Sequence, residues 1–173
     1  DTEGPASAVT IPAGAKVVDL AGKTVIPGMF DEHAHLHYST LDVFPQRPWK
    51  YLANLAYGVT TTHDPSASNQ EAFGQSEMVE AGLMIGPRIF STGYILYGAE
   101  NTEKTVVNSY DDAKASVERM KMVGAFSLKS YNQPRRNQRQ QIIKAARDLQ
   151  MMVVPEGGST YFYNMTEILD GHT

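Results

Sequence analysis

The segment VIPGMFDEHAHLH, residues 25–37, places one aspartate and three histidines at alternating positions directly after an apolar run and a Pro-Gly pair. Alternate residues of an extended strand share a face, so Asp31, His33 and His35 are expected to project together from its carboxyl end. Two imidazoles on one face can bind one divalent ion. The other interpretation is that these side chains are partly buried and bonded to backbone carbonyls. His37 continues the spacing and is expected in the following loop.

Lys129 is a second residue that could do chemistry. In the segment AFSLKSY it shares a strand face with Ser127 and Tyr131. Burying an ammonium group costs several kcal/mol unless the group is paired or neutralised, so this lysine indicates a partner or a modification. Two alternatives stay open. The aliphatic stem could cover the core while the amine reaches solvent, or a desolvated amine could form a Schiff base with a carbonyl substrate.

The elements that must position these residues alternate between strands and helices. A short strand is expected over residues 16–20 outside the main core, and five more strands within 24–30, 58–66, 87–96, 125–131 and 151–158. Helices are expected over 46–57, 69–81, 110–123 and 134–149, and from residue 164 onward. This alternation is typical of βα units in a parallel sheet, although a doubly wound sheet fits it too. A complete eight-stranded barrel usually needs about 250 residues, so the chain would hold about five of its eight units.

Composition disfavours several classes of protein. The 173 residues, 42% of them hydrophobic, suit one globular domain with a substantial core. A net charge of -4 without a basic block disfavours nucleic-acid binding. With no cysteine, a metal site must use histidine, carboxylate or a modified side chain. No long apolar run or signal peptide is evident, so no membrane partner is expected, and the protein could be cytoplasmic or exported with its signal removed.

Three segments carry a resemblance to the metal-dependent amidohydrolase superfamily. PGMFDEHAHLH resembles its first-strand signature, in which Pro-Gly precedes Asp-x-His-x-His. KVVDLAGKTVIPG resembles the strand that joins that family's small β-sandwich to its barrel, and GVTTTHDPS resembles its second strand. The likeness is greatest to the imidazolonepropionase-like branch, whose members hydrolyse cyclic amides or peptide-like bonds. It implies that residues 1–24 are a remnant of the β subdomain and that residues 25–173 are the N-terminal portion of a partial TIM-like (β/α) barrel.

The same resemblance implies a centre with one or two divalent ions, for which zinc is the first choice, although manganese, iron and cobalt stay open. His33 and His35 match the family's first-strand ligands, and Lys129 occupies the strand whose lysine the family carbamylates to bridge two metals. Glu156 departs from the pattern, because the family commonly has a histidine there. Glu156 is expected either to replace that ligand or to contact the substrate. Three further residues are expected to contact the substrate or to support the ligands: Asp31, His63 and Tyr131.

The reaction implied is attack by a metal-activated water on an amide-like carbonyl of a small-molecule substrate, with an aspartate as general base. That aspartate and the sixth-strand histidine would fall beyond Thr173, because His172 precedes the histidine's position, so a fragment of a longer enzyme is expected. Two other functions stay open. One is a non-catalytic metal-binding half-barrel that forms homo-oligomers through open sheet edges. The other is an unrelated α/β enzyme with a Schiff-base lysine.

Overall fold

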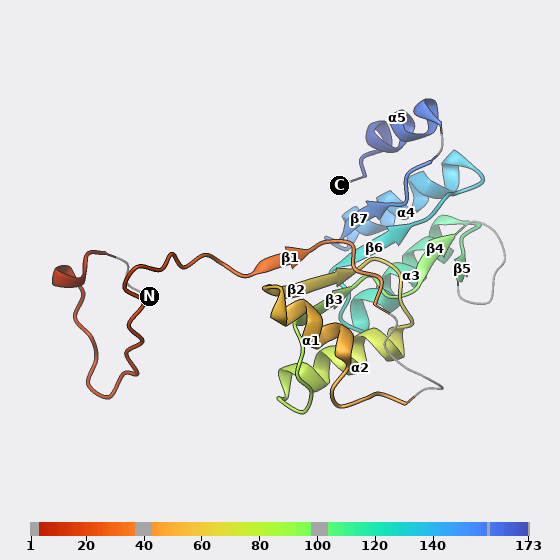
Figure 1. Ribbon diagram of the computed structural model, residues 1–173. Coiled ribbons are helices and arrows are strands. Elements are labelled where there is room, and N and C mark those ends of the chain that lie inside the picture. The colour runs from red at the N-terminus through yellow and green to blue at the C-terminus, as the bar shows by residue number, and fades with distance from the viewer. Residues whose placement is uncertain (1–3, 37–42, 98–103, 159, 173) are drawn as a thin grey trace.

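The structure is a computed structural model that describes residues 4–36, 43–97, 104–158 and 160–172. Residues 4–28 form an extended arm that leaves the body of the molecule and contains one short 3-10 helix, Ala6–Ala8 (Figure 1). The arm forms no strand, so the strand expected over residues 16–20 is absent. The physical reason is that this segment has no neighbouring strand in the described chain with which its backbone groups could pair.

The strands of the described chain form two parallel sheets. The first contains β1 (Met29–Asp31), β2 (Val59–Asp64) and β3 (Arg88–Ser91), in that order. The second has the order β5 (Lys104–Val106), β4 (Ile95–Tyr97), β6 (Ser127–Ser130) and β7 (Met152–Pro155). Every neighbouring pair is parallel, as the alternation of strands and helices predicts for an α/β protein.

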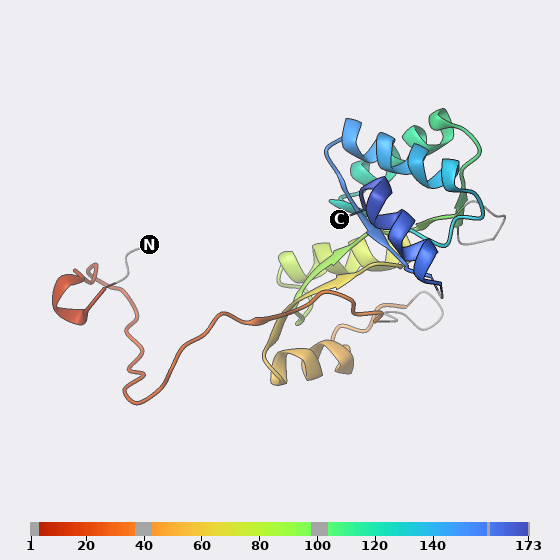
Figure 2. The same cartoon turned by 90° about the horizontal axis from the view of Figure 1, so that it is seen from above.

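The helices follow the predicted order. They are α1 (Trp49–Ala56), α2 (Asn69–Glu80), α3 (Tyr110–Met122), α4 (Arg136–Asp148) and α5 (Tyr161–Asp170). Figure 2 shows α3 and α4 side by side over the second sheet. Helix α3 begins with a capping box, because Ser109 Oγ accepts the N–H of Asp112 at 3.1 Å while Asp112 Oδ2 accepts the N–H of Ser109 at 3.0 Å. No helix of the described chain is long and apolar enough to span a membrane.

Two helix boundaries differ from the predicted ones. Helix α5 begins at Tyr161, three residues before the predicted start, because the hydroxyl of Thr160 accepts the N–H of Tyr163 at 3.4 Å and caps the helix. Helix α4 begins at Arg136, so Pro134 precedes the helix instead of lying in its first turn. Both differences are local and leave the order of the elements unchanged.

The segment expected as one strand over residues 87–96 divides into β3 and β4, which belong to different sheets. The division occurs at Gly93, whose backbone has a positive φ of 65°. The N–H of Gly93 donates to Ser91 Oγ at 2.9 Å, so it bonds to a side chain instead of a neighbouring strand. A side chain at this position would also collide with Asn69, whose Oδ1 lies 2.2 Å from an ideal Cβ. Strand β5 was not predicted from the sequence.

The larger hydrophobic cluster lies between the second sheet and helices α3 and α4. Its fully buried members include Leu96, Val117, Leu128 and Ile142. Leu128 belongs to this cluster, and because alternate strand residues face opposite sides, its neighbours Ser127 and Lys129 face away from the cluster. The core therefore fixes β6 in a way that turns Lys129 toward the opposite face of the sheet.

Candidate functional site

The two histidines of the opening motif meet just beyond β1. The strand ends at Asp31, and Asp31 Oδ1 accepts the N–H of His33 at 3.1 Å, which closes a turn. The Nε2 atoms of His33 and His35 are 3.0 Å apart, and their ring centroids are 4.7 Å apart. The two imidazoles thus come together as expected, but they do so in a turn after the strand and not on one strand face with Asp31. Asp31 shapes the turn and stays exposed, whereas the two imidazoles converge after it. His37 lies outside the described residues.

Asp64, at the end of β2, supports the histidine pair. Its Oδ1 lies 3.0 Å from His35 Nδ1 and accepts the N–H of Ser66 at 2.9 Å. Its side chain is only 3% exposed. Because a carboxylate oxygen only accepts, His35 donates from Nδ1, and in its neutral form its Nε2 lone pair points toward His33. This is the arrangement in which a carboxylate orients a metal-binding histidine.

Lys129 and Glu156 form an ion pair at the ends of β6 and β7. Lys129 Nζ lies 2.6 Å from Glu156 Oε2, and the two side chains are 1% and 33% exposed. Pro155, the last residue of β7, pairs with Ser130 of β6, and Glu156 comes directly after it. The N–H of Glu156 donates to the carbonyl of Ser130 at 3.1 Å. The alternative in which the amine of Lys129 reaches solvent is excluded by this burial. Nζ has no partner of good hydrogen-bond geometry within the described part of the chain, so the contact with Glu156 is an ion pair.

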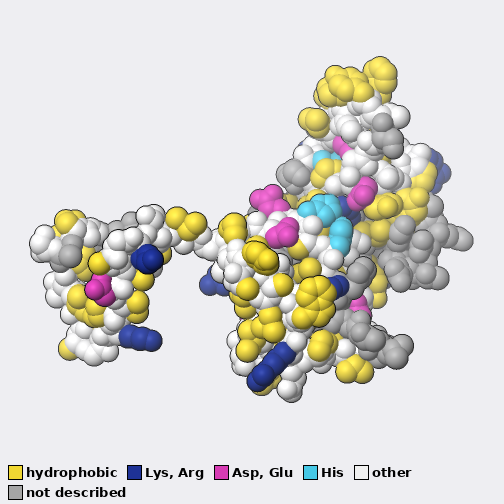
Figure 3. Space-filling model, viewed as in Figure 1, with side chains coloured by type: hydrophobic (Ala, Val, Ile, Leu, Met, Phe, Trp, Pro, Cys, Tyr) yellow, Lys and Arg dark blue, Asp and Glu magenta, His cyan; other side chains and the backbone are white. Residues whose placement is uncertain are grey.

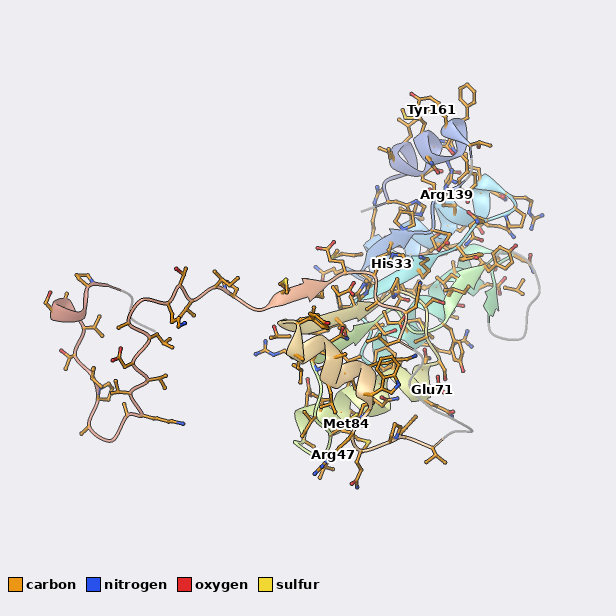
Figure 4. All side chains as sticks on the ribbon, in the orientation of Figure 1. His33, Arg47, Glu71, Met84, Arg139 and Tyr161 are labelled. Atoms are coloured by element: carbon orange, nitrogen blue, oxygen red, sulfur yellow. The ribbon has the colours of Figure 1, made fainter. Side chains whose placement is uncertain are left out.

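Burial and nearby charges favour the neutral form of His33. Partial burial lowers the pKa of His33, and the charges of Lys129 and His35 lower it further, against the opposing effect of Glu156 and Asp64. A neutral imidazole is the form that binds a metal. Figure 4 shows His33 between the ribbons of β1 and β6, and Figure 3 shows histidine side chains beside acidic and basic ones on this face.

His63 contacts the residue that precedes the histidine pair. It is buried on β2, with Nδ1 3.2 Å from the carbonyl oxygen of Glu32 and Nε2 2.9 Å from Ser127 Oγ. Burial lowers the pKa of His63 and outweighs the hydrogen bond to Glu32, which raises it. The ring is therefore neutral near pH 7, with its proton on Nδ1, because the carbonyl oxygen can only accept.

The remaining candidates lie around or away from this centre. Tyr131 packs edge-on against Tyr97, with ring centroids 5.3 Å apart, at the ends of β6 and β4. His172 is buried at the end of α5, where its Nδ1 lies 4.0 Å from Glu167 Oε1, and it is not part of the histidine pair. Sequence reasoning misses two residues beside the centre. Asp64 precedes Pro65, where a capped turn is the simpler interpretation, and Ser127 is marked only by sharing the strand face of Lys129.

The residues present suit two positions of a metal site. The 3.0 Å between the Nε2 atoms of His33 and His35 is close to the roughly 3.3–3.4 Å that tetrahedral zinc imposes on two nitrogen ligands about 2.1 Å away. Within residues 4–36, 43–97, 104–158 and 160–172, no three His, Asp or Glu side chains converge closely enough to hold an ion. Glu156 is paired with Lys129, and it would have to leave this partner to become a third ligand.

Comparisons with known proteins bear on the fold. No protein-family model and no curated protein matches this sequence. A crystal structure described as an amidohydrolase matches with a TM-score of 0.73 and 19% identity, over 96% of this chain and 51% of its own. A Xaa-Pro dipeptidase with methionine bound in its active site matches with a TM-score of 0.64 and 18% identity, over 84% and 46%. The ochratoxinase of A. niger matches with a TM-score of 0.64 and 15% identity, over 84% and 46%.

These matches confirm, at the level of the fold, the resemblance to amidohydrolases that the sequence indicates. Identities of 15–19% are too low to carry an activity from those proteins to this one. The chain spans about half the length of these structures.

Proposed function

We propose that this chain forms the N-terminal part of the (β/α) barrel of a metal-dependent amidohydrolase, which hydrolyses an amide-like C–N bond of a small molecule. The observation that carries the proposal is the pairing of His33 and His35 at 3.0 Å, with Asp64 behind His35. This pair lies at the carboxyl edge of β1, and Lys129 and Glu156 lie at the carboxyl edges of β6 and β7. In βα barrels, chemistry takes place at this edge.

Each residue of the centre has a distinct proposed role. His33 and His35 hold the ion through their Nε2 atoms, and Asp64 holds His35 in the required tautomer. When bound, a divalent ion such as zinc lowers the pKa of water and polarises the carbonyl of the substrate. Tyr97 and Tyr131 lie at the same edge, where they can contact the substrate.

Lys129 is proposed to react with carbon dioxide. The ammonium group would first lose one proton to solvent. The neutral Nζ would then form a bond to the carbon of carbon dioxide as one C–O π bond opens onto oxygen, and a second proton would leave the nitrogen for solvent. The product is an anionic carbamate, so the attraction between Lys129 and Glu156 in the ion pair would become repulsion. A divalent metal ion between the carbamate of Lys129 and the carboxylate of Glu156 would offset this repulsion. Carbamylation and metal binding are therefore expected to depend on each other.

A metal and activity screen tests the proposal. The protein is purified with Zn²⁺, Mn²⁺ or Co²⁺, its metal content is measured by mass spectrometry, and dipeptides, N-acyl amino acids and cyclic amides are offered as substrates. We expect bound metal and, from the longer protein that carries the rest of the barrel, metal-dependent hydrolysis. Both should be lost in the His33→Ala, His35→Ala double variant. A double variant that keeps the metal content and activity of the unmodified protein would contradict the proposal.

The same preparation separates the two other functions. A metal-binding assembly module predicts bound metal and a stable oligomer without hydrolysis of any substrate in the panel. A Schiff-base enzyme predicts that borohydride with a carbonyl compound traps Lys129 without metal. The ion pair with Glu156 does not separate the two reactions of Lys129, because the protonated amine must lose a proton before it can attack either carbon dioxide or a carbonyl compound.

A further inference from the structure

The two halves of the proposed site belong to different sheets. His33 and His35 follow β1, and Asp64 ends β2, both in the first sheet. Lys129 on β6 and Glu156 after β7 belong to the second sheet. No pairing between strands joins these two sheets within the described residues. The distance between the two halves must therefore be set by other contacts.

One such contact is a buried hydrogen bond that crosses from the first sheet to the second. His63 Nε2 on β2 lies 2.9 Å from Ser127 Oγ on β6, and both residues are buried. Aromatic rings pack beside this bond. The ring of Phe126 lies 5.5 Å from that of His63 and 5.6 Å from that of Phe90, measured between centroids. His63 and Ser127 are themselves buried, so water is kept from the hydrogen bond, which strengthens it.

The direction of the hydrogen bonds follows from the chemistry of the groups. The carbonyl oxygen of Glu32 can only accept, so His63 donates from Nδ1. In the neutral ring Nε2 then carries the lone pair, and Ser127 donates its hydroxyl proton to it. A single chain of hydrogen bonds thus runs from Ser127 through His63 to the carbonyl of Glu32.

Both ends of this series of hydrogen bonds lie next to residues of the proposed site. Glu32 immediately precedes His33, in the turn that brings the two imidazoles together. Ser127 precedes Lys129 by two residues and shares its strand face. A shift at either end would move a metal ligand relative to the other half of the site. Catalytic centres tolerate displacements of only about 0.5 Å.

We propose that His63 and Ser127 form a latch between the two sheets, in which His63 is a positioning residue that sets the place of His33 relative to Lys129. The consequence for metal binding rests on the function proposed above. The latch itself is a property of the fold and can be measured without metal. Its loss is expected to lower metal affinity without removing any ligand.

Three substitutions test the latch. Ser127→Ala removes the hydroxyl. His63→Asn keeps an amide donor near the position of Nδ1, for Glu32, but cannot reach Ser127. His63→Gln keeps an amide near the position of Nε2, for Ser127, but leaves the carbonyl of Glu32 without its donor. The matched control is Ser116→Ala, because Ser116 is equally buried but bonds to the carbonyl of Asp112 within α3.

The first measurement is Co²⁺ affinity, followed by the visible absorption of the bound ion. We expect each of the three variants to bind Co²⁺ about 10-fold more weakly and with an altered spectrum, since loss of a supporting group typically costs 10–100-fold. Ser116→Ala should bind like the unmodified protein. The double variant His63→Asn, Ser127→Ala should be no worse than His63→Asn alone, because both changes break the same bond.

The second measurement needs no metal. Nitrogen-15 NMR of the histidine rings should show His63 protonated at Nδ1, and Ser127→Ala should shift the ring resonances of His33. A proton on Nε2 of His63, together with unchanged His33 resonances in Ser127→Ala, would overturn the latch.

The two proposals fail in distinguishable ways. If His33→Ala abolishes Co²⁺ binding while the three latch variants bind normally, the latch is wrong and the metal site stands. If the unmodified protein binds no Co²⁺ but the NMR results are as expected, the latch stands and the proposed function fails. Additive losses in the double variant would indicate that the two residues act separately, and this result also overturns the latch.

Discussion

Asp64 Oδ1 lies 3.0 Å from His35 Nδ1, although 29 positions of the sequence separate the two residues. The contact joins the end of β2 to the turn after β1, and it orients the ring whose Nε2 meets His33. A buried carboxylate in this position makes the imidazole a better metal ligand, because it stabilises positive charge on the ring.

Asp64→Asn should therefore weaken metal binding by 10–100-fold while leaving both histidines in place. An asparagine oxygen can still accept the N–H of Ser66, so the turn is expected to survive. The matched control is Asp19→Asn, because Asp19 Oδ1 also accepts a backbone N–H two residues later, that of Ala21 at 2.9 Å, but lies in the exposed arm. Competition with a chromophoric chelator gives both affinities. Equal affinities for the two variants would exclude a supporting role for Asp64.

The ion pair of Lys129 and Glu156 should contribute more to stability than an exposed pair of the same length. Lys144 Nζ and Asp148 Oδ2 are also 2.6 Å apart, but their side chains are 63% and 45% exposed. Exposed pairs four residues apart on a helix contribute about 0.3–0.5 kcal/mol. For Lys129 and Glu156, a double-mutant cycle with Lys129→Met and Glu156→Gln is expected to give a coupling energy of about 1–3 kcal/mol.

Urea unfolding of the metal-free protein gives both coupling energies, with Lys144→Met and Asp148→Asn as the second cycle. A coupling energy for the buried pair that is no larger than that of the exposed pair would contradict the expectation. Such a result would mean that Lys129 has another partner in solution.

Carbamylation of Lys129 should be detectable directly. Protein incubated with carbon-13 bicarbonate and Zn²⁺ is expected to show one carbamate resonance by carbon-13 NMR, which should be absent from Lys129→Met. Lys144→Met should keep the resonance, because Lys144 is an exposed lysine in α4 outside the site. No resonance from the unmodified protein, at any metal concentration that fills the site, would show that Lys129 acts as an unmodified amine.

Asp170 should make the stability of the fold depend on acid pH. It accepts hydrogen bonds at 2.7 Å from both Arg136 and Arg139, which join α5 to α4. Burial raises the pKa of Asp170, but the arginine bonds outweigh burial and lower it from 3.8 to about 2. Because the folded pKa is below the unfolded one, the carboxylate stabilises the fold above about pH 4, and this contribution is lost as the pH falls to about 2.

The expected loss from Asp170 is about 2 kcal/mol of unfolding free energy between pH 5 and pH 2. Urea denaturation at four pH values in this range measures it. The Asp170→Asn variant should be less stable than the unmodified protein at pH 5. Its free energy of unfolding should not show the loss between pH 5 and pH 2 that is due to Asp170. If the Asp170→Asn variant and the unmodified protein give parallel curves, the carboxylate is not held by the two arginines as described.

Local features could be predicted from the sequence because they depend on neighbouring residues. The 3.6-residue spacing of apolar side chains, the capping box at Ser109 and the β-branched strands determine most of the elements. The pattern Asp-x-His-x-His and a lysine in an apolar strand likewise indicate the proposed site and the resemblance to amidohydrolases. The end of β1 at Asp31 was not predicted, since alternation along a strand does not show where the strand ends.

The partners of the site residues were decided only by the tertiary structure. Asp64 meets His35 across 29 positions, and His63 meets Ser127 across 64. Such contacts depend on the register of neighbouring strands and on the packing of one sheet against the other, and a shift of one residue would turn each side chain to the opposite face. The sequence by itself determined which residues could bind a metal and which elements hold them. The pairing of β1 with β2 within the first sheet decided that Asp64 lies against His35. The contact between the two sheets decided that His63 meets Ser127.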